Sequence, residues 1–184
     1  MTLLKRFQRI IRAEINDRSI RAGIPEKDLT RLIRKLKAVV REYRKTAASS
    51  LARQRGLESK MNEYLEKAAE WRQTAARAGS AGKEELARQA GAKCKEFETQ
   101  AGGYELPLTS RQKYNSRLDE VLFELQSGID DAELRIMLHG AGGDNTEAGM
   151  TLNRLRLRLD LMEDKVRDLD SLEASAAQLD NIDN

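Results

Sequence analysis

The sequence has few of the residues that build a compact globular core. Aromatic residues make up only 4% of its 184 residues, and there are only two prolines, Pro25 and Pro107. Charged residues reach 34%, and Ala, Leu, Glu, Arg and Lys recur along the whole chain. Such a composition is typical of long helices or coiled coil and argues against a single bulky core.

The chain is also poor in cysteine and in uninterrupted apolar segments. Its one cysteine, Cys94, excludes an internal disulfide and fits a reducing compartment. No stretch of about 18 uncharged apolar residues occurs, so we expect no transmembrane helix. Arg9 and Arg12 interrupt the apolar residues near the start, and we therefore do not expect a secretory signal.

Sequence motifs for catalysis or cofactor binding are absent as well. Lys83 follows Gly82 but precedes Glu84, whereas a phosphate loop needs Ser or Thr at that place and a strand before it. The glycines of residues 140–143 lack the third glycine of a dinucleotide fingerprint and also lack a preceding strand. His139 is the only histidine and has no partners at catalytic or metal-ligand spacing. We therefore predict no catalytic, cofactor-binding or metal-binding residue, and a protein that is not an enzyme.

Charge is present in abundance and is distributed unevenly. The formal net charge is +3, but residues 1–23 hold six basic against two acidic residues. Residues 160–184 hold two basic against eight acidic residues. A basic head and an acidic tail suggest an anionic partner for the head.

Apolar residues recur every three or four positions along two long segments, which is the period of an α-helix. The first segment runs from about 27 to 78, roughly 78 Å as a straight helix, and the second from 83 to 138. A helix of that length cannot bury its apolar stripe within a small globule and needs a partner helix. We expect the two segments to pair antiparallel, with Leu36 opposite Leu125 and Trp71 opposite Ala90.

The turn between the two arms and one interruption of the second arm are also visible in the sequence. Gly79, Ser80, Ala81 and Gly82 separate the arms, and we predict that they form the tip of one hairpin over 23–139. Inside the second arm, Gly102 and Gly103 precede Pro107. Glycine costs about 1 kcal/mol and proline about 3 kcal/mol in a helix interior, so we expect a kink or a short break there.

Residues 1–22 are predicted to form a separate amphipathic helix. One side is apolar and the other basic, which describes a helix that lies in a membrane interface. The candidate membrane-binding residues are Leu3, Leu4, Lys5, Arg6, Phe7, Arg9, Ile10, Ile11 and Arg12.

Three alternatives remain for this segment. The stripe could dock on the hairpin as ordinary core, or the segment could resemble a transit peptide, although Glu14 and Asp17 count against that class. The cations could also meet nucleic acid, but no stacking or base-reading aromatics accompany them, so we expect no nucleic-acid partner.

Residues 140–184 are predicted to form a C-terminal helical segment with an acidic end. Its apolar positions again step largely by three and four. One hairpin seam does not obviously bury this stripe as well as its own two arms, so we expect an exposed interaction surface. The candidate assembly residues are Leu152, Leu155, Leu159, Met162, Val166 and Leu169.

Several strings resemble the phage-shock protein A family, which includes the vesicle-inducing protein in plastids and belongs to the wider ESCRT-III superfamily. The strings Ala69-Glu-Trp71 and Glu84-Glu-Leu-Ala-Arg88 on the two sides of the tip are similar to the hairpin-tip region of that family. The string Arg158-Leu-Asp-Leu-Met-Glu163 resembles its later RIDQME-type string. Residues 1–15 resemble its amphipathic first helix, and Pro25 falls where its long first arm begins.

The resemblance implies an extended all-α fold and a function that composition alone does not show. Members of the family are cytoplasmic, bind the inner face of anionic membranes and polymerise into rods or rings that remodel or protect the bilayer. The resemblance places the C-terminal stripe across the hairpin of a neighbouring chain. In some members the hairpin inhibits an AAA+ transcriptional activator, which is a candidate partner. The alternative function is a soluble coiled-coil adaptor or regulator that binds a protein through its first helix or hairpin.

Overall fold

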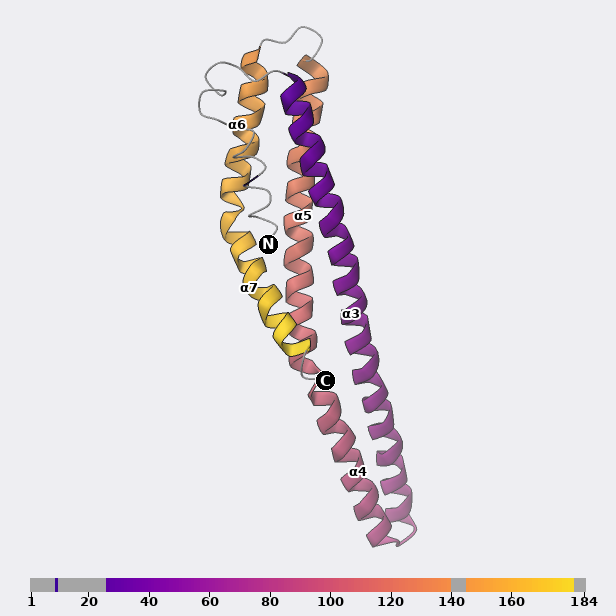
Figure 1. Cartoon of the computed structure of the whole chain (residues 1–184). Helices are drawn as coiled ribbons and strands as arrows, with labels where there is room; N and C mark the ends of the chain where they lie inside the picture. Colours follow the sequence, from indigo (N-terminus) through magenta and orange to yellow (C-terminus); the bar gives the residue numbers. More distant parts are fainter. Residues whose placement is uncertain (1–8, 10–25, 140–144, 181–184) are drawn as a thin grey trace. The chain divides into compact units, whose positions relative to one another are not determined.

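The computed structural model describes residue 9, residues 26–139 and residues 145–180. Across these ranges the chain forms α-helices and short turns, without a strand, which confirms the all-α fold class. The helices are α3 (Glu26–Ser80), α4 (Glu84–Gly102), α5 (Glu105–His139), α6 (Asn145–Leu161) and α7 (Glu163–Asp180) (Figure 1). The predicted helix over residues 1–22 lies, except for Arg9, outside the described residues.

The described helices divide into two compact units. The first unit consists of Met1–Ala48 and Asn115–Glu173, and the second consists of Ser49–Tyr114 and Ala174–Asn184. The helices α3, α5 and α7 each contribute residues to both units.

In the first unit α3, α5 and the α6–α7 segment pack around one apolar core (Figure 1). Leu36 of α3 and Leu118 and Val121 of α5 are completely buried. The antiparallel pairing of α3 and α5 is marked by two polar contacts that join Lys37 to Glu133 and Arg44 to Gln126. Further buried apolar residues of this core are Leu32, Ile33, Val39, Val40, Leu122, Leu125, Ile129, Ala132, Leu155, Met162 and Leu169.

In the second unit α3 and α4 pack along a seam of small residues. The buried positions are Ala68, Ala78, Ala90, Cys94 and Ala101. Small side chains allow two helices to approach closely, and larger side chains are then displaced to the edges of the seam. This explains a departure from the sequence prediction, because Trp71 was expected to pack inside the seam and instead remains 36% exposed.

The expected interruption of the second arm is confirmed as a short break between α4 and α5. Gly103 and Tyr104 form a turn, in which the Tyr104 amide donates to the Ala101 carbonyl at 3.0 Å. The break moves Pro107 from a helix interior to the third position of α5. An amide in the first turn of a helix has no intrahelical acceptor, so proline costs little there.

Candidate functional surfaces

The predicted membrane-binding residues lie almost entirely outside the described part of the chain. Arg9 is the exception, and its side chain is exposed. None of the helices that the structure describes is long and apolar enough to cross a membrane. The membrane-binding role of residues 3–12 therefore stays a prediction from the sequence.

The turn between α3 and α4 follows the hydrogen-bond pattern of a glycine-capped helix end. Gly82 has a φ of 70°, in the left-handed region that L-residues with a Cβ avoid. The Lys83 amide donates to the Ala78 carbonyl at 2.9 Å, and the Gly82 amide donates to the Gly79 carbonyl at 3.1 Å. These are the two bonds of a Schellman motif, which satisfies carbonyls that the end of a helix would leave unpaired.

The residues of this turn are exposed to solvent and lie in open space. Gly79, Ser80, Ala81 and Gly82 are all exposed, and no heavy atom would meet a Cβ added at Gly79 or Gly82 within 4 Å. The open space means that the glycine at position 82 is required by backbone conformation and not by crowding.

The candidate assembly stripe of the C-terminal helices faces the first unit's own core. Leu155, Met162 and Leu169 are buried, at 7%, 2% and 3% exposure. The expectation that the stripe is exposed is therefore wrong for these three residues. The physical reason is that α5 presents a buried arc wide enough to pack against α3 and against α6–α7 together. The side chains of Leu152, Leu159 and Val166 lie outside the described residues.

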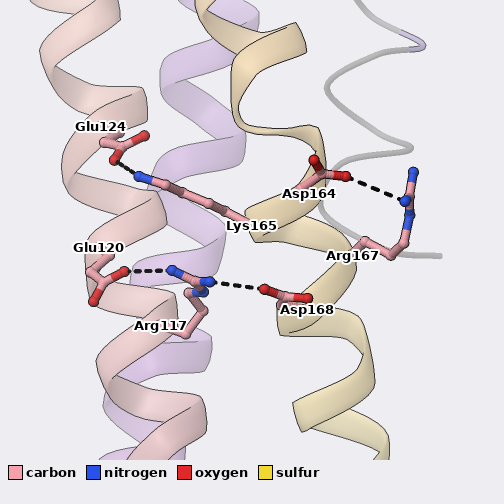
Figure 2. A network of polar contacts seen from close by, with 7 residues as sticks. All are labelled: Arg117, Glu120, Glu124, Asp164, Lys165, Arg167 and Asp168. Carbon is pink, nitrogen blue, oxygen red and sulfur yellow. Dashed lines mark hydrogen bonds and ion pairs between the residues drawn. The ribbon is translucent and has the colours of Figure 1, made fainter.

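A network of ion pairs fastens α7 to α5 in the first unit, and Figure 2 shows its members. Arg117 of α5 lies 2.9 Å from Asp168 of α7 and also 2.9 Å from Glu120 on its own helix. The hydrogen bond to Asp168, followed by that to Glu120, raises the pKa of the Arg117 guanidinium. Lys165 of α7 donates to Glu124 of α5. The network links α7 to α5 at the surface, and exposed pairs of this kind each contribute only about 0–1 kcal/mol.

The second unit holds a cluster of aromatic rings and cations contributed by α3, α4 and the turn between α4 and α5. The Tyr64 ring stacks on Phe97 and on Tyr104, with centroid separations of 6.3 and 5.8 Å. The ammonium group of Lys67 lies 5.5 Å from the centre of the Tyr64 ring, and that of Lys60 lies 5.8 Å from the Tyr104 ring. Aromatic pairs and cation–π contacts each add about 0.5–1.5 kcal/mol, so the cluster supports the hairpin where the seam is otherwise built from alanine.

A buried arginine joins three helices of the second unit. Arg111 of α5 is 5% exposed. Its guanidinium donates to the Ser50 hydroxyl of α3 and to the Ala176 carbonyl of α7, each at 3.4 Å. The sequence shows Arg111 only as a polar interruption of an apolar stripe, and the pattern does not indicate which groups it meets.

Metal binding and thiol chemistry find no support in the described ranges. Within residues 26–139 and 145–180 there is no group of three or more His, Cys, Asp or Glu side chains that could hold a metal ion. Cys94 is buried, with its sulfur 3.6 Å from Glu98.

The sequence predicted the helices but not which side chains pair between them. Arg117 and Asp168 are 51 positions apart, and no local spacing relates them. The one signal was the excess of acidic residues after position 160, which are within reach of cations on α5 once the helices pack.

Comparison with known proteins gives concordant matches over most of the chain. The family model described as "PspA/IM30 family" matches residues 2–173. This match confirms the resemblance predicted from the sequence. The chain is 28% identical over 188 residues to the membrane-associated protein Vipp1 of Synechocystis, covering 97% of this chain and 70% of that relative. It is also 28% identical over 155 residues to a phage shock protein A homolog of Deinococcus radiodurans, covering 84% of this chain and 70% of the relative. A Vipp1 of Nostoc punctiforme is 27% identical over 135 residues.

Proposed function

Because the chain belongs to the PspA/IM30 family, we propose that it binds membranes peripherally and homo-polymerises into rods or rings that remodel, stabilise or repair them. The observation that carries this proposal is the family match over residues 2–173. A relative that covers 97% of this chain is named a membrane-associated protein. The protein acts without catalysis, on the cytoplasmic face of the cell membrane.

Membrane contact is assigned to residues 3–12. Their apolar side chains enter the boundary between headgroups and acyl chains, and the binding strength follows the buried apolar area. The cations Lys5, Arg6, Arg9 and Arg12 each add about 1 kcal/mol near an anionic leaflet. Anionic lipids are therefore the preferred partner, and added salt weakens the binding because part of it is screened.

Assembly is assigned to the apolar stripe of the C-terminal helices. Leu155, Met162 and Leu169 are buried within their own chain, and Leu155 and Met162 lie beside Leu125 and Ile129 of α5. This role therefore requires α6 and α7 to leave that position and pack across the hairpin of a neighbour. A contact of this kind joins two different surfaces, and such contacts propagate into rings or helical filaments instead of closing as a dimer.

The membrane assignment is tested by vesicle co-sedimentation of a double substitution. Phe7→Asp with Ile11→Asp is expected to abolish binding to anionic vesicles, because two carboxylates then replace apolar anchors and repel the leaflet. Helicity measured by circular dichroism is expected to stay nearly unchanged. The matched control is Leu157→Asp with Leu161→Asp, which adds the same charge at exposed leucines of α6 and is expected to retain binding.

Two outcomes contradict this assignment. If the Phe7 and Ile11 variant still sediments with anionic vesicles, the membrane site lies elsewhere in the chain. If the unsubstituted chain stays in the supernatant with every vesicle composition, the soluble adaptor function is favoured instead.

A further inference from the structure

An apolar stripe runs along the outer face of α5 in the first unit. Phe123, Leu134, Met137 and Leu138 are 76%, 55%, 83% and 70% exposed. Leu134, Met137 and Leu138 follow Phe123 by 11, 14 and 15 positions, which places the four residues within a sector of about 100° on one side of the helix. The core-facing residues of α5, such as Leu118 and Leu125, occupy the opposite side. We call these four exposed residues the α5 stripe.

The surroundings of the α5 stripe are acidic. Residues 117–138 contain two basic residues and six acidic ones. Four of these acidic side chains pair with Lys37, Arg117, Arg135 and Lys165, which leaves Asp119 and Asp130 outside these ion pairs. Asp119 and Asp130 are exposed and lie on the same side of the helix as the stripe. An occupant that matches this surface has an apolar face with cations along its edges, because desolvated carboxylates need partners of opposite sign.

Residues 3–15 of the same chain have this chemistry. Their apolar positions are flanked by Lys5, Arg6, Arg9 and Arg12, and residues 1–23 carry a net charge of +4. As a helix, 13 residues span about 20 Å, and the 15 steps from Phe123 to Leu138 span about 22 Å. The two stripes therefore match in length as well as in charge.

The course of the chain brings residues 3–15 to this face. The helix α3 begins at Glu26 and pairs antiparallel with α5, with Lys37 Nζ 2.6 Å from the Glu133 carboxylate. The start of α3 therefore lies at the same end of the pair as Leu138. Residues 16–25 reach at most about 33 Å when fully extended, which is enough to place residue 15 beside Leu138 with residue 3 toward Phe123.

We propose that, in the chain free of membrane, residues 3–15 dock on the α5 stripe. The apolar side chains that enter the bilayer are the same ones that cover α5, so docking and membrane binding exclude each other. Docking is an intramolecular property of the chain. Its consequence for lipid binding rests on the proposed function.

Docking is measured without membranes by the distance between two spin labels. The labels are placed at Thr2→Cys and Ser116→Cys in a chain that also carries Cys94→Ser. A narrow short-distance population is expected in this chain. Leu134→Gln with Met137→Gln is expected to abolish that population, because the apolar contact is lost while the charge is unchanged. Leu157→Gln with Leu161→Gln is the control, since these α6 residues are 56% and 81% exposed, and it is expected to retain the population.

Two results of the distance measurement overturn the proposal. One is the same distribution in all three chains. The other is a short-distance population that disappears when the labelled chain is diluted with unlabelled chain, because the occupant is then a second copy.

The consequence for membranes is measured with the same two double variants and anionic vesicles. Undocking raises the fraction of chains whose residues 3–15 are free to bind lipid. Leu134→Gln with Met137→Gln is therefore expected to reach half-maximal binding at a lipid concentration that is at most about one fifth of that needed by the unsubstituted chain. The control pair is expected to bind like the unsubstituted chain. Equal affinities in all chains overturn the competition between docking and the bilayer. The proposed function fails separately, if the Phe7 and Ile11 variant keeps its binding.

Discussion

At the scale of single residues, two of the arginines of α5 have different surroundings. Arg111 is buried, and its guanidinium donates hydrogen bonds to the Ser50 hydroxyl and to the Ala176 carbonyl. Arg117 lies at the surface beside Asp168 and Glu120, with 29% of its side chain exposed. Burial decides how much each arginine contributes to the free energy of unfolding. When a buried donor is removed, its acceptors stay buried and gain no hydrogen bond from water, whereas a surface carboxylate is hydrated again.

Alanine substitutions at these two positions are expected to separate clearly in stability. Arg111→Ala is expected to lower the free energy of unfolding by about 1–3 kcal/mol, because the Ser50 hydroxyl and the Ala176 carbonyl lose a charged partner. Arg117→Ala is expected to lower it by less than about 1 kcal/mol. Urea denaturation followed by circular dichroism measures both. Equal losses in the two variants would contradict the burial argument.

At the scale of elements, the sequence was sufficient for the helices because their period is local. The arms predicted over 27–78 and 83–138 correspond to α3, and to α4 followed by α5, and Gly102 with Gly103 located the break. The period identifies the apolar face of each helix but not how many helices cover that face. For this reason the exposure of Trp71 and the burial of Met162 were not predictable.

Candidate surfaces were less predictable than helices for the same reason. Residue pairs such as Arg117 and Asp168, or Tyr64 and Phe97, meet only after the helices pack. The α5 stripe is a related case. Its spacing is helical and readable, but its exposure depends on which sides of α5 are occupied by α3 and by α6–α7.

The α3–α4 turn offers a test of glycine conformation with a matched control close by. Gly82→Ala is expected to lower the free energy of unfolding by about 1–2 kcal/mol, because its φ of 70° is unfavourable for a residue with a Cβ. Gly79→Ala is expected to raise it by up to about 1 kcal/mol, since Gly79 is helical and has open space around it. Thermal unfolding of the two variants measures the difference. Shifts of the same sign would show that the turn does not depend on the left-handed residue.

At the scale of the whole molecule, assembly and folding use the same apolar side chains. Leu155, Met162 and Leu169 are buried against their own chain, and the proposed polymer needs them against a neighbour. Both requirements are met if α6 and α7 leave the α5 surface of their own chain and pack on the equivalent surface of a neighbouring chain. The contacts between α7 and α5 are then a barrier to assembly, and the ion pairs of Figure 2 are part of that barrier.

A covalent tie between α7 and α5 is therefore expected to prevent assembly. Lys165 donates to Glu124, so a carbodiimide that activates carboxylates joins these two side chains as an amide with loss of water. The treated chain is expected to remain a small species by light scattering, because α7 is held on its own α5. The control is Lys165→Arg, which keeps the positive charge but does not form this amide. After the same treatment that variant is expected to assemble to the size of the untreated chain. If both treated chains form equally large assemblies, α7 stays in place during polymerisation and the assembly surface lies on another face of the helices.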